Sequence, residues 1–188
     1  MGFELNPYDS CVANKMVGGS QMTILWHVDD LKISHVNEDE VMGMYTKLNN
    51  RYGQEAPLTI NKGPCLDYLG MTMDYSIDGK VIIGMDDFVQ RILQDAPDDM
   101  GGLSVTPAAN YLFNVNSKAT KLDNKKAELF HHLVAMMLYL CKRVRPDIHT
   151  TVAFLCTRVT APDEDDYKKL ARCVKYLRAY PDLKLTLE

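Results

Sequence analysis

Residues 21–34 read QMTILWHVDDLKIS and place two adjacent aspartates, Asp29 and Asp30, between two apolar runs. Both runs are rich in β-branched and aromatic residues, which predicts two strands joined at the aspartates. Three other Asp-Asp pairs stand at predicted helix starts or turns: 86–87, 98–99 and 165–166. An Asp-Asp pair is a poor two-residue hairpin turn, because neither residue is glycine. We therefore expect a requirement other than turn geometry to hold these carboxylates at the hairpin tip.

The composition describes a chain that can bury a core. Of its 188 residues, 46% are hydrophobic and 24% are charged, enough for one or two small domains. No apolar run is long enough for a bilayer, and no secretory signal pattern is visible. The five cysteines are widely spaced without a CxxC pair, which argues against a zinc site or a disulfide framework. We expect an intracellular protein, cytoplasmic or nuclear, with reduced thiols and no membrane partner.

The net charge of −4 is unevenly distributed. Residues 1–104 hold 7 Lys and Arg against 16 Asp and Glu, a net charge of −9. Residues 105–188 hold 14 against 9, a net charge of +5. This asymmetry favours cations as partners of the first half and polyanions as partners of the second. Solvated helix faces explain the same numbers, and charge alone favours that plainer explanation.

The first half reads as strands with short helices. Strands are expected at 10–17, 21–28 and 31–36, with Gly18-Gly19 turning the first into the second. A helix to about residue 52 begins at Asn37, with Glu40 completing a capping box, and ends at Gly53. Strands follow at 58–63, 65–76 and 80–85, with a turn at 78–79, and a helix at 87–96 closes this half.

The second half changes to a helical period. Residues 97–116 are rich in Pro, Gly and Asn and read as a linker. Helices are expected at 125–144, 149–160 and 163–180, separated by Pro146 and Pro162. The sequence thus predicts an α+β fold with a sheet-containing domain at 1–96, a linker at 97–120 and a helical part at 121–188.

Paired carboxylates at a strand–turn–strand tip repel each other unless a cation lies between them. Mg²⁺ is a hard ion that takes oxygen ligands and keeps positions for substrate phosphates. Polymerases use two such ions to activate the primer hydroxyl and stabilise the leaving pyrophosphate. Two carboxylates cannot complete that site, so a third is expected elsewhere.

Several motifs in series resemble one family. HVDDLKIS, from His27, resembles the YxDD box of reverse transcriptases in the YVDD form of LTR retrotransposons. GFELNPYDSCV resembles the segment that copia-type elements place before the box, and YLGMTMDYS resembles their primer grip. Residues 106–113, 130–159 and 171–187 resemble the thumb, the connection and the last helix before ribonuclease H. The pattern Leu-Tyr-Leu-x-x-x-x-Arg-Pro-Asp-Ile is met by residues 138–148.

The resemblance assigns roles residue by residue. Asp29 and Asp30 become catalytic metal ligands in a two-metal Mg²⁺ site. The residues His27, Val28, Leu69 and Gly70 would contact the primer. Apart from the resemblance, helical spacing places the basic residues Lys168, Arg172 and Lys175 near one face. Such a face either follows a phosphate backbone or is a solvated face that only keeps the helix soluble. The implied fold is a partial palm followed by a helical thumb and connection, and the implied activity is RNA-directed DNA synthesis.

The implied partners are an RNA template, a DNA primer, dNTP, and the upstream reverse-transcriptase segment, ribonuclease H and integrase of a polyprotein. His27 replaces the usual tyrosine of the box. The family's first catalytic aspartate and fingers precede the region that matches this chain, so we expect the site to be incomplete here. We also expect an exposed sheet edge beside residues 21–28, with a risk of aggregation.

Two alternatives remain open. One is a nucleic-acid-binding remnant of the same fold that no longer catalyses. The other is a structural or interaction domain in which Asp29 and Asp30 are incidental, since short motifs can mislead.

Overall fold

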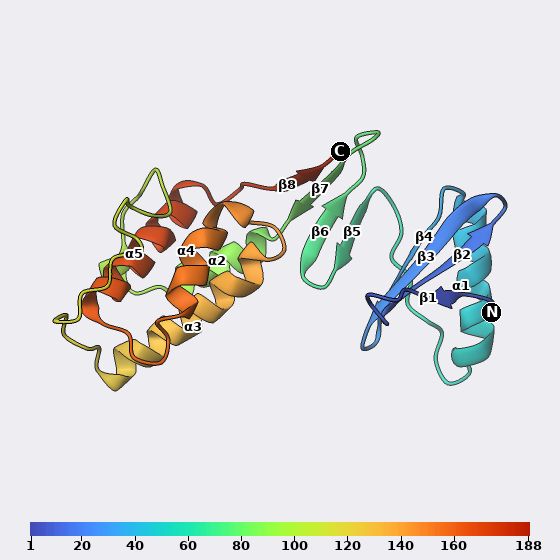
Figure 1. The fold of residues 1–188 in the computed structure, drawn as a ribbon. Helices are drawn as coiled ribbons and strands as arrows, with labels where there is room; N and C mark the ends of the chain where they lie inside the picture. The colour runs from blue at the N-terminus through green and yellow to red at the C-terminus, as the bar shows by residue number, and fades with distance from the viewer. The chain divides into compact units, whose positions relative to one another are not determined.

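A computed structural model describes residues 1–188 and divides them into two units, residues 1–69 and 70–188 (Figure 1). The fold is α+β, with two small antiparallel sheets and five α-helices, which confirms the predicted class. None of these helices combines the length and the apolar character needed to cross a bilayer.

The first unit is built on a sheet with strand order β1-β2-β3-β4. Its strands are β1 (Glu4–Leu5), β2 (Val12–Val17), β3 (Ser20–His27) and β4 (Asp30–Ser34). Alternate residues of β3 face a small core, in which Met22 and Ile24 pack with Met44 of helix α1 (Glu38–Tyr52). Asn37 caps α1, as predicted, by accepting a hydrogen bond from the Asp39 N–H at 2.9 Å. The predicted capping box with Glu40 is wrong, because the Asn37 N–H donates to His35 Nδ1 at 3.1 Å instead. The unit ends with strand β5 (Cys65–Tyr68).

The predicted exposed edge beside residues 21–28 is wrong. Strand β3 pairs with β2 from Ser20 to Leu25 and with β4 from Thr23 to His27, so it is a central strand. The first-half sequence already contains both neighbours, because two tight turns fold consecutive segments back onto β3. The predicted strand at 58–63 is also wrong, since those residues form no regular element. The predicted strand at 65–76 is interrupted by a turn at Leu69-Gly70.

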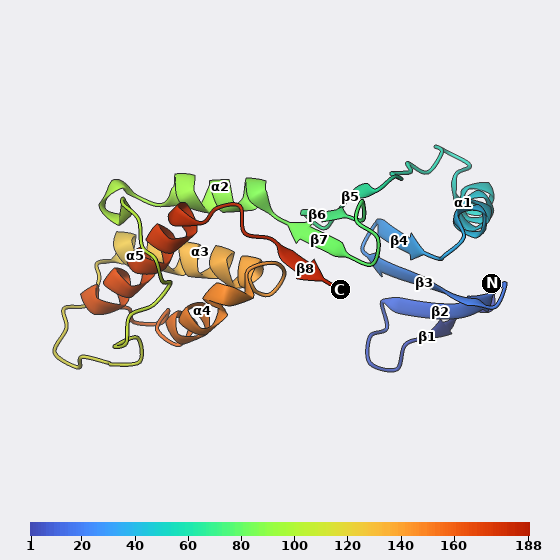
Figure 2. The same cartoon turned by 90° about the horizontal axis from the view of Figure 1, so that it is seen from above.

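The second unit combines three strands with a helical bundle. Its elements are β6 (Met71–Asp74), β7 (Val81–Gly84), α2 (Asp86–Asp95), the 3-10 turn η1 (Asp98–Met100), α3 (Asn124–Cys141), η2 (Pro146–Ile148), α4 (His149–Cys156), α5 (Glu164–Ala179) and β8 (Leu185–Leu187). Figure 2 shows α2, α3, α4 and α5 gathered together, and β7 pairs antiparallel with both β6 and β8. Strand β8 was not predicted, because its three residues follow a long helical pattern without a separate signal.

The core of the second unit explains why the observed division differs from the predicted boundary at residue 96. Ile83, Val89 and Ile92, from β7 and α2, lie in the same buried cluster as the helical bundle. The bundle contributes Phe130, Leu133, Met137, Leu140, Ile148, Val152, Leu155, Leu170 and Leu177 to that cluster. Burial of this shared apolar surface ties residues 70–96 to the helices. The two residues that separate the units in sequence are Leu69 and Gly70.

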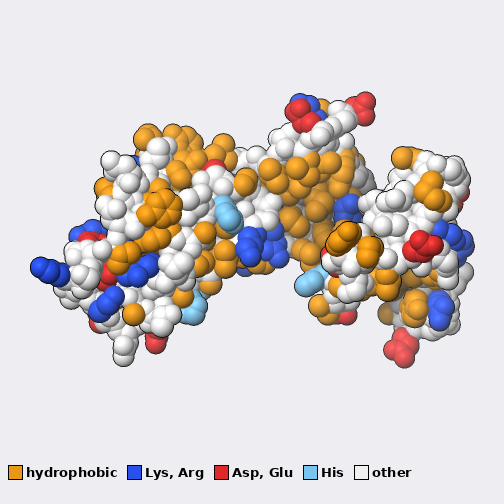
Figure 3. Space-filling model, viewed as in Figure 1, with side chains coloured by type: hydrophobic (Ala, Val, Ile, Leu, Met, Phe, Trp, Pro, Cys, Tyr) orange, Lys and Arg blue, Asp and Glu red, His pale blue; other side chains and the backbone are white.

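We call residues 101–116 the strap. They contain no helix, no strand and no charged side chain, and they run along α5. Arg178 donates to the carbonyls of Met100 and Gly102, the Ser104 N–H donates to the Lys175 carbonyl, and Lys169 donates to the Asn114 carbonyl. Apolar side chains reach the surface of this unit in Figure 3. Those exposed on the strap are Leu103, Val105, Tyr111, Phe113 and Val115.

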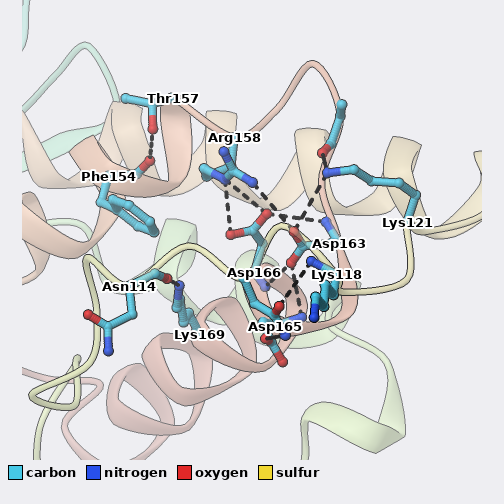
Figure 4. Close-up of polar contacts among 12 residues, drawn as sticks. Asn114, Lys118, Lys121, Phe154, Thr157, Arg158, Asp163, Asp165, Asp166 and Lys169 are labelled. Carbon is cyan, nitrogen blue, oxygen red and sulfur yellow. Dashed lines mark hydrogen bonds and ion pairs between the residues drawn. The ribbon is translucent and has the colours of Figure 1, made fainter.

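The start of α5 is held by a buried charge cluster (Figure 4). Asp163 and Asp166 form a capping box, with the Asp166 N–H donating to Asp163 Oδ1 at 3.0 Å. Arg158 Nε lies 3.0 Å from Asp166 Oδ2, and Lys121 Nζ lies 3.6 Å from Asp163 Oδ2. Burial acts to raise the pKa of Asp163, but the Asp166 N–H and the two cations outweigh it and lower that pKa.

Arg145 forms a second ion pair within the corner before α4 and also donates a hydrogen bond to the end of α5. The guanidinium of Arg145 is 1% exposed and grips Asp147, with Nε 3.0 Å from Oδ1 and Nη2 2.8 Å from Oδ2. Its Nη1 donates to the Tyr180 carbonyl at 2.9 Å. Burial acts to raise the pKa of Asp147, but the hydrogen bond and charge of Arg145 outweigh it and lower that pKa.

We predict that Asp147→Asn lowers the free energy of unfolding by about 3 kcal/mol at pH 7, because it leaves the buried Arg145 charge without a counter-ion. The folded-state pKa of Asp147 is lowered, so the pair stabilises the fold above the unfolded pKa of about 3.9. This contribution disappears as the pH falls through the folded-state pKa. Urea unfolding of both proteins from pH 7 to pH 3 measures it.

Asp182→Asn is the matched control, because Asp182 is exposed near the same end of α5. It should change the free energy of unfolding by less than about 0.5 kcal/mol. An Asp147→Asn protein as stable as this control at pH 7 would contradict the role given to the pair.

Candidate metal-binding hairpin

The two aspartates lie at the turn between β3 and β4, but they do not form it together. His27 pairs with Asp30, so the two loop residues are Val28 and Asp29, and Asp30 is the first residue of β4. The predicted turn at Asp29-Asp30 is therefore displaced by one residue. The strand register explains this shift, because pairing His27 with Asp30 leaves only Val28 and Asp29 to connect the strands.

Val28 has a left-handed backbone conformation, with φ of 53°. Asp29 has no positive φ, and positive φ at the first loop residue alone is the pattern of a type II′ turn, where glycine is usual. A β-branched residue pays a steric penalty there. Val28 is also 84% exposed, so buried contacts do not offset that penalty. Strain of this kind is a reason to look for function at the turn.

The side chains around this turn face solvent. His27, Asp29 and Asp30 are all exposed, and Leu31 beside them is 48% exposed. Nowhere in the structure do three or more His, Cys, Asp or Glu side chains form a group that could hold a metal ion. Mg²⁺, however, is commonly bound by one or two carboxylates together with waters and substrate phosphates. The donor set at this turn therefore suits a weak site for a hard cation that further ligands would complete.

Tyr68 is a neighbour of this turn that the sequence did not single out. Burial raises the pKa of its phenol, and the charges of Asp30 and Cys11 raise it further. The phenol of Tyr68 thus lies within electrostatic range of the Asp30 carboxylate. The available signal was its position immediately before Leu69 and Gly70, in the motif assigned to the primer grip.

Leu69 and Gly70 form a second tight turn with an unusual backbone. Their φ angles are 53° and 74°, and positive φ at both central residues is the pattern of a type I′ turn. Gly70 adopts this conformation without a steric cost, whereas Leu69 does not. The two predicted primer-grip residues therefore lie at the turn between β5 and β6.

The three basic residues predicted to follow a phosphate backbone have different environments. Lys168 is exposed, with 74% of its side chain accessible, and lies 3.4 Å from Asp165. Arg172 is half-buried and donates from Nη2 to Thr106 Oγ1 of the strap. Lys175 is also half-buried beside the strap. Nucleic-acid binding by this face stays a prediction, with Lys168 as its most accessible member.

Comparison of the chain with known protein families, curated proteins and solved structures gives no match.

We predict that Val28→Gly raises the free energy of unfolding of the first unit by about 1 kcal/mol. Glycine removes the left-handed penalty, and the added flexibility of the unfolded chain offsets part of that gain. Chemical denaturation followed by the fluorescence of Trp26 reports on this unit, because Trp26 packs against its core and is the chain's only tryptophan.

Val36→Gly is the matched control, since Val36 is also highly exposed, at 83%, and has no positive φ. This variant should lose stability by about 0.5–1 kcal/mol. Equal losses in both variants would show that the turn at Val28 stores no strain.

Proposed function

We propose that the chain is the palm, thumb and connection part of a copia-type reverse transcriptase, and that Asp29 and Asp30 are two of its catalytic carboxylates. One observation carries the proposal: two adjacent exposed carboxylates stand at a strained two-residue turn between two paired strands. Its further support is the order of the motifs along the chain, from GFELNPYDSCV to the last helix.

Mg²⁺, when bound, would supply the charge that activates the primer hydroxyl and stabilises the leaving pyrophosphate. Asp29 and Asp30 would supply carboxylate oxygens as metal ligands. The pairing of His27 with Asp30 fixes the backbone positions of both residues. Val28 and His27 flank these oxygens and would contact the primer end. Leu69 and Gly70 would hold the primer backbone from their own turn. Tight positioning of reactants accounts for much of the rate gain in such reactions.

In this proposal an upstream reverse-transcriptase segment completes the active site. It would supply the third carboxylate, the fingers and the dNTP-binding residues that the family carries before the box. The substrates are then an RNA template, a DNA primer and dNTP, with ribonuclease H and integrase as further parts of the same polyprotein. Asp29 and Asp30 alone cannot hold two metal ions in register with a triphosphate.

We predict that the 188-residue chain does not extend a DNA primer on an RNA template, whereas its fusion to an upstream copia-type segment does. Asp29→Asn or Asp30→Asn in the fusion should lower extension by about a hundredfold or more, because each removes charge stabilisation from the transition state. Primer extension resolved on a gel, with Mg²⁺ and dNTP, measures this directly.

The control is Asp86→Asn with Asp87→Asn, an acidic pair at the start of α2, which should leave extension largely unchanged. Extension by the unfused chain would contradict the need for a third carboxylate. A folded fusion that remains inactive, even after His27→Tyr, would favour the non-catalytic remnant.

A further inference from the structure

Thr106 and Arg172 meet where the strap crosses α5. Arg172 Nη2 donates to Thr106 Oγ1 at 2.9 Å, and the Thr106 hydroxyl donates to the Ala108 carbonyl at 2.9 Å. Thr106 is exposed. The neighbouring Nε of Arg172 is shielded from solvent and has no hydrogen-bond partner. A buried donor without a partner is rare in proteins and requires an explanation.

Two other arginines show what this guanidinium edge can bind. Nε and Nη2 form one side of the planar group and suit two oxygens of a single anion. Arg145 places this edge against both oxygens of Asp147. Arg158 places the same edge against Asp166 and Asp163. Arg172 presents an equivalent edge toward Thr106, but the single hydroxyl oxygen there satisfies only Nη2.

The sequence around Thr106 also sets this residue apart, independently of its contact with Arg172. Of the eight prolines, only Pro107 follows a serine or threonine. A Thr-Pro pair is the minimal recognition element of proline-directed protein kinases, which bind extended substrate segments. The strap has no regular secondary structure. It also has no carboxylate that would repel an added phosphate, and Lys175 lies one helical turn from Arg172.

We propose that Thr106 is a phosphorylation site for a proline-directed protein kinase, and that the edge of Arg172 binds the resulting phosphate and fastens the strap to α5. The kinase transfers the γ-phosphoryl group of ATP to Thr106 Oγ1. A P–O bond forms at Oγ1, the bond from the γ-phosphorus to ADP breaks, and the hydroxyl proton passes to the kinase's catalytic base.

The phosphate supplies the acceptor that Arg172 Nε lacks when Thr106 carries only a hydroxyl. Its oxygens accept from both Nε and Nη2 of Arg172, and charge-assisted bonds of this kind are stronger than the neutral contact they replace. The Ala108 carbonyl loses its hydroxyl donor. This site is independent of the polymerase proposal, since it involves neither Asp29 nor Asp30.

The first experiment asks whether the full chain is modified. The 188-residue protein is incubated with ATP and a proline-directed kinase, and phosphopeptides are mapped by mass spectrometry. We expect one phosphate at Thr106, none there in Thr106→Ala, and much less in Pro107→Ala. A synthetic peptide of residues 101–112 confirms that the kinase is active. Modification of the peptide but not of the folded protein would overturn the proposal.

The second experiment asks whether Arg172 binds the phosphate. Phosphorylation should raise the melting temperature at low salt by about 2–4 °C. It should also lower the second phosphate pKa, followed by phosphorus NMR, below its usual value of about 6. Arg172→Lys keeps the charge but loses the two-donor edge, so it should remove most of both effects.

Lys168→Gln is the matched control, because Lys168 is an exposed cation on the same helix. Both effects of phosphorylation should persist in this variant. Equal effects in the wild type and in Arg172→Lys, or a phosphate that lowers the melting temperature, would overturn the role of Arg172.

Discussion

The two-residue connection between β3 and β4 constrains the whole of the first unit. Because His27 and Asp30 face each other across the ladder, Val28 must turn the chain and adopts a left-handed conformation. The same register places Met22 and Ile24 on the face that packs against α1. A slip by one residue would relieve Val28 but would move those side chains out of the core. The position of Asp29 and Asp30 is thus fixed by burial elsewhere in the sheet.

In the second unit, arginine side chains bind carboxylates through the Nε and Nη2 edge of the guanidinium group. Arg145 uses this edge to bind Asp147 in η2, and Arg158 uses it to bind Asp166 and Asp163 at the start of α5. Each pairing satisfies a charge that would otherwise be costly to bury. Arg172 lies within α5, and its Nη2 contacts a hydroxyl instead of a carboxylate, which distinguishes the Thr106 contact from the other two. One recurring geometry therefore connects the stability of the bundle to the proposed phosphate site.

The sequence was most informative where a local rule and the tertiary packing agree. The helices that start after Asn37 and after Pro162 are predictable because local hydrogen bonds at their N-termini decide where they begin. The turn at the aspartates was misplaced by one residue, since no local rule favours a left-handed valine. Strand β8 and the contact between Thr106 and Arg172 join segments far apart in sequence, and periodicity does not report such contacts. The acidic pair itself was identified because the neighbouring residues gave it no structural role.

We propose that Asp29 and Asp30 supply the protein's ligands to a divalent-cation site. Titration of the isotope-labelled chain with Mn²⁺ tests it most directly, because the paramagnetic ion broadens amide signals near the place where it binds. We expect broadening centred on Asp29 and its neighbours in the β3–β4 turn, and we expect it to disappear when both aspartates are changed to asparagine. Broadening centred instead on Asp86 or Asp98, and unaffected by those changes, would contradict it.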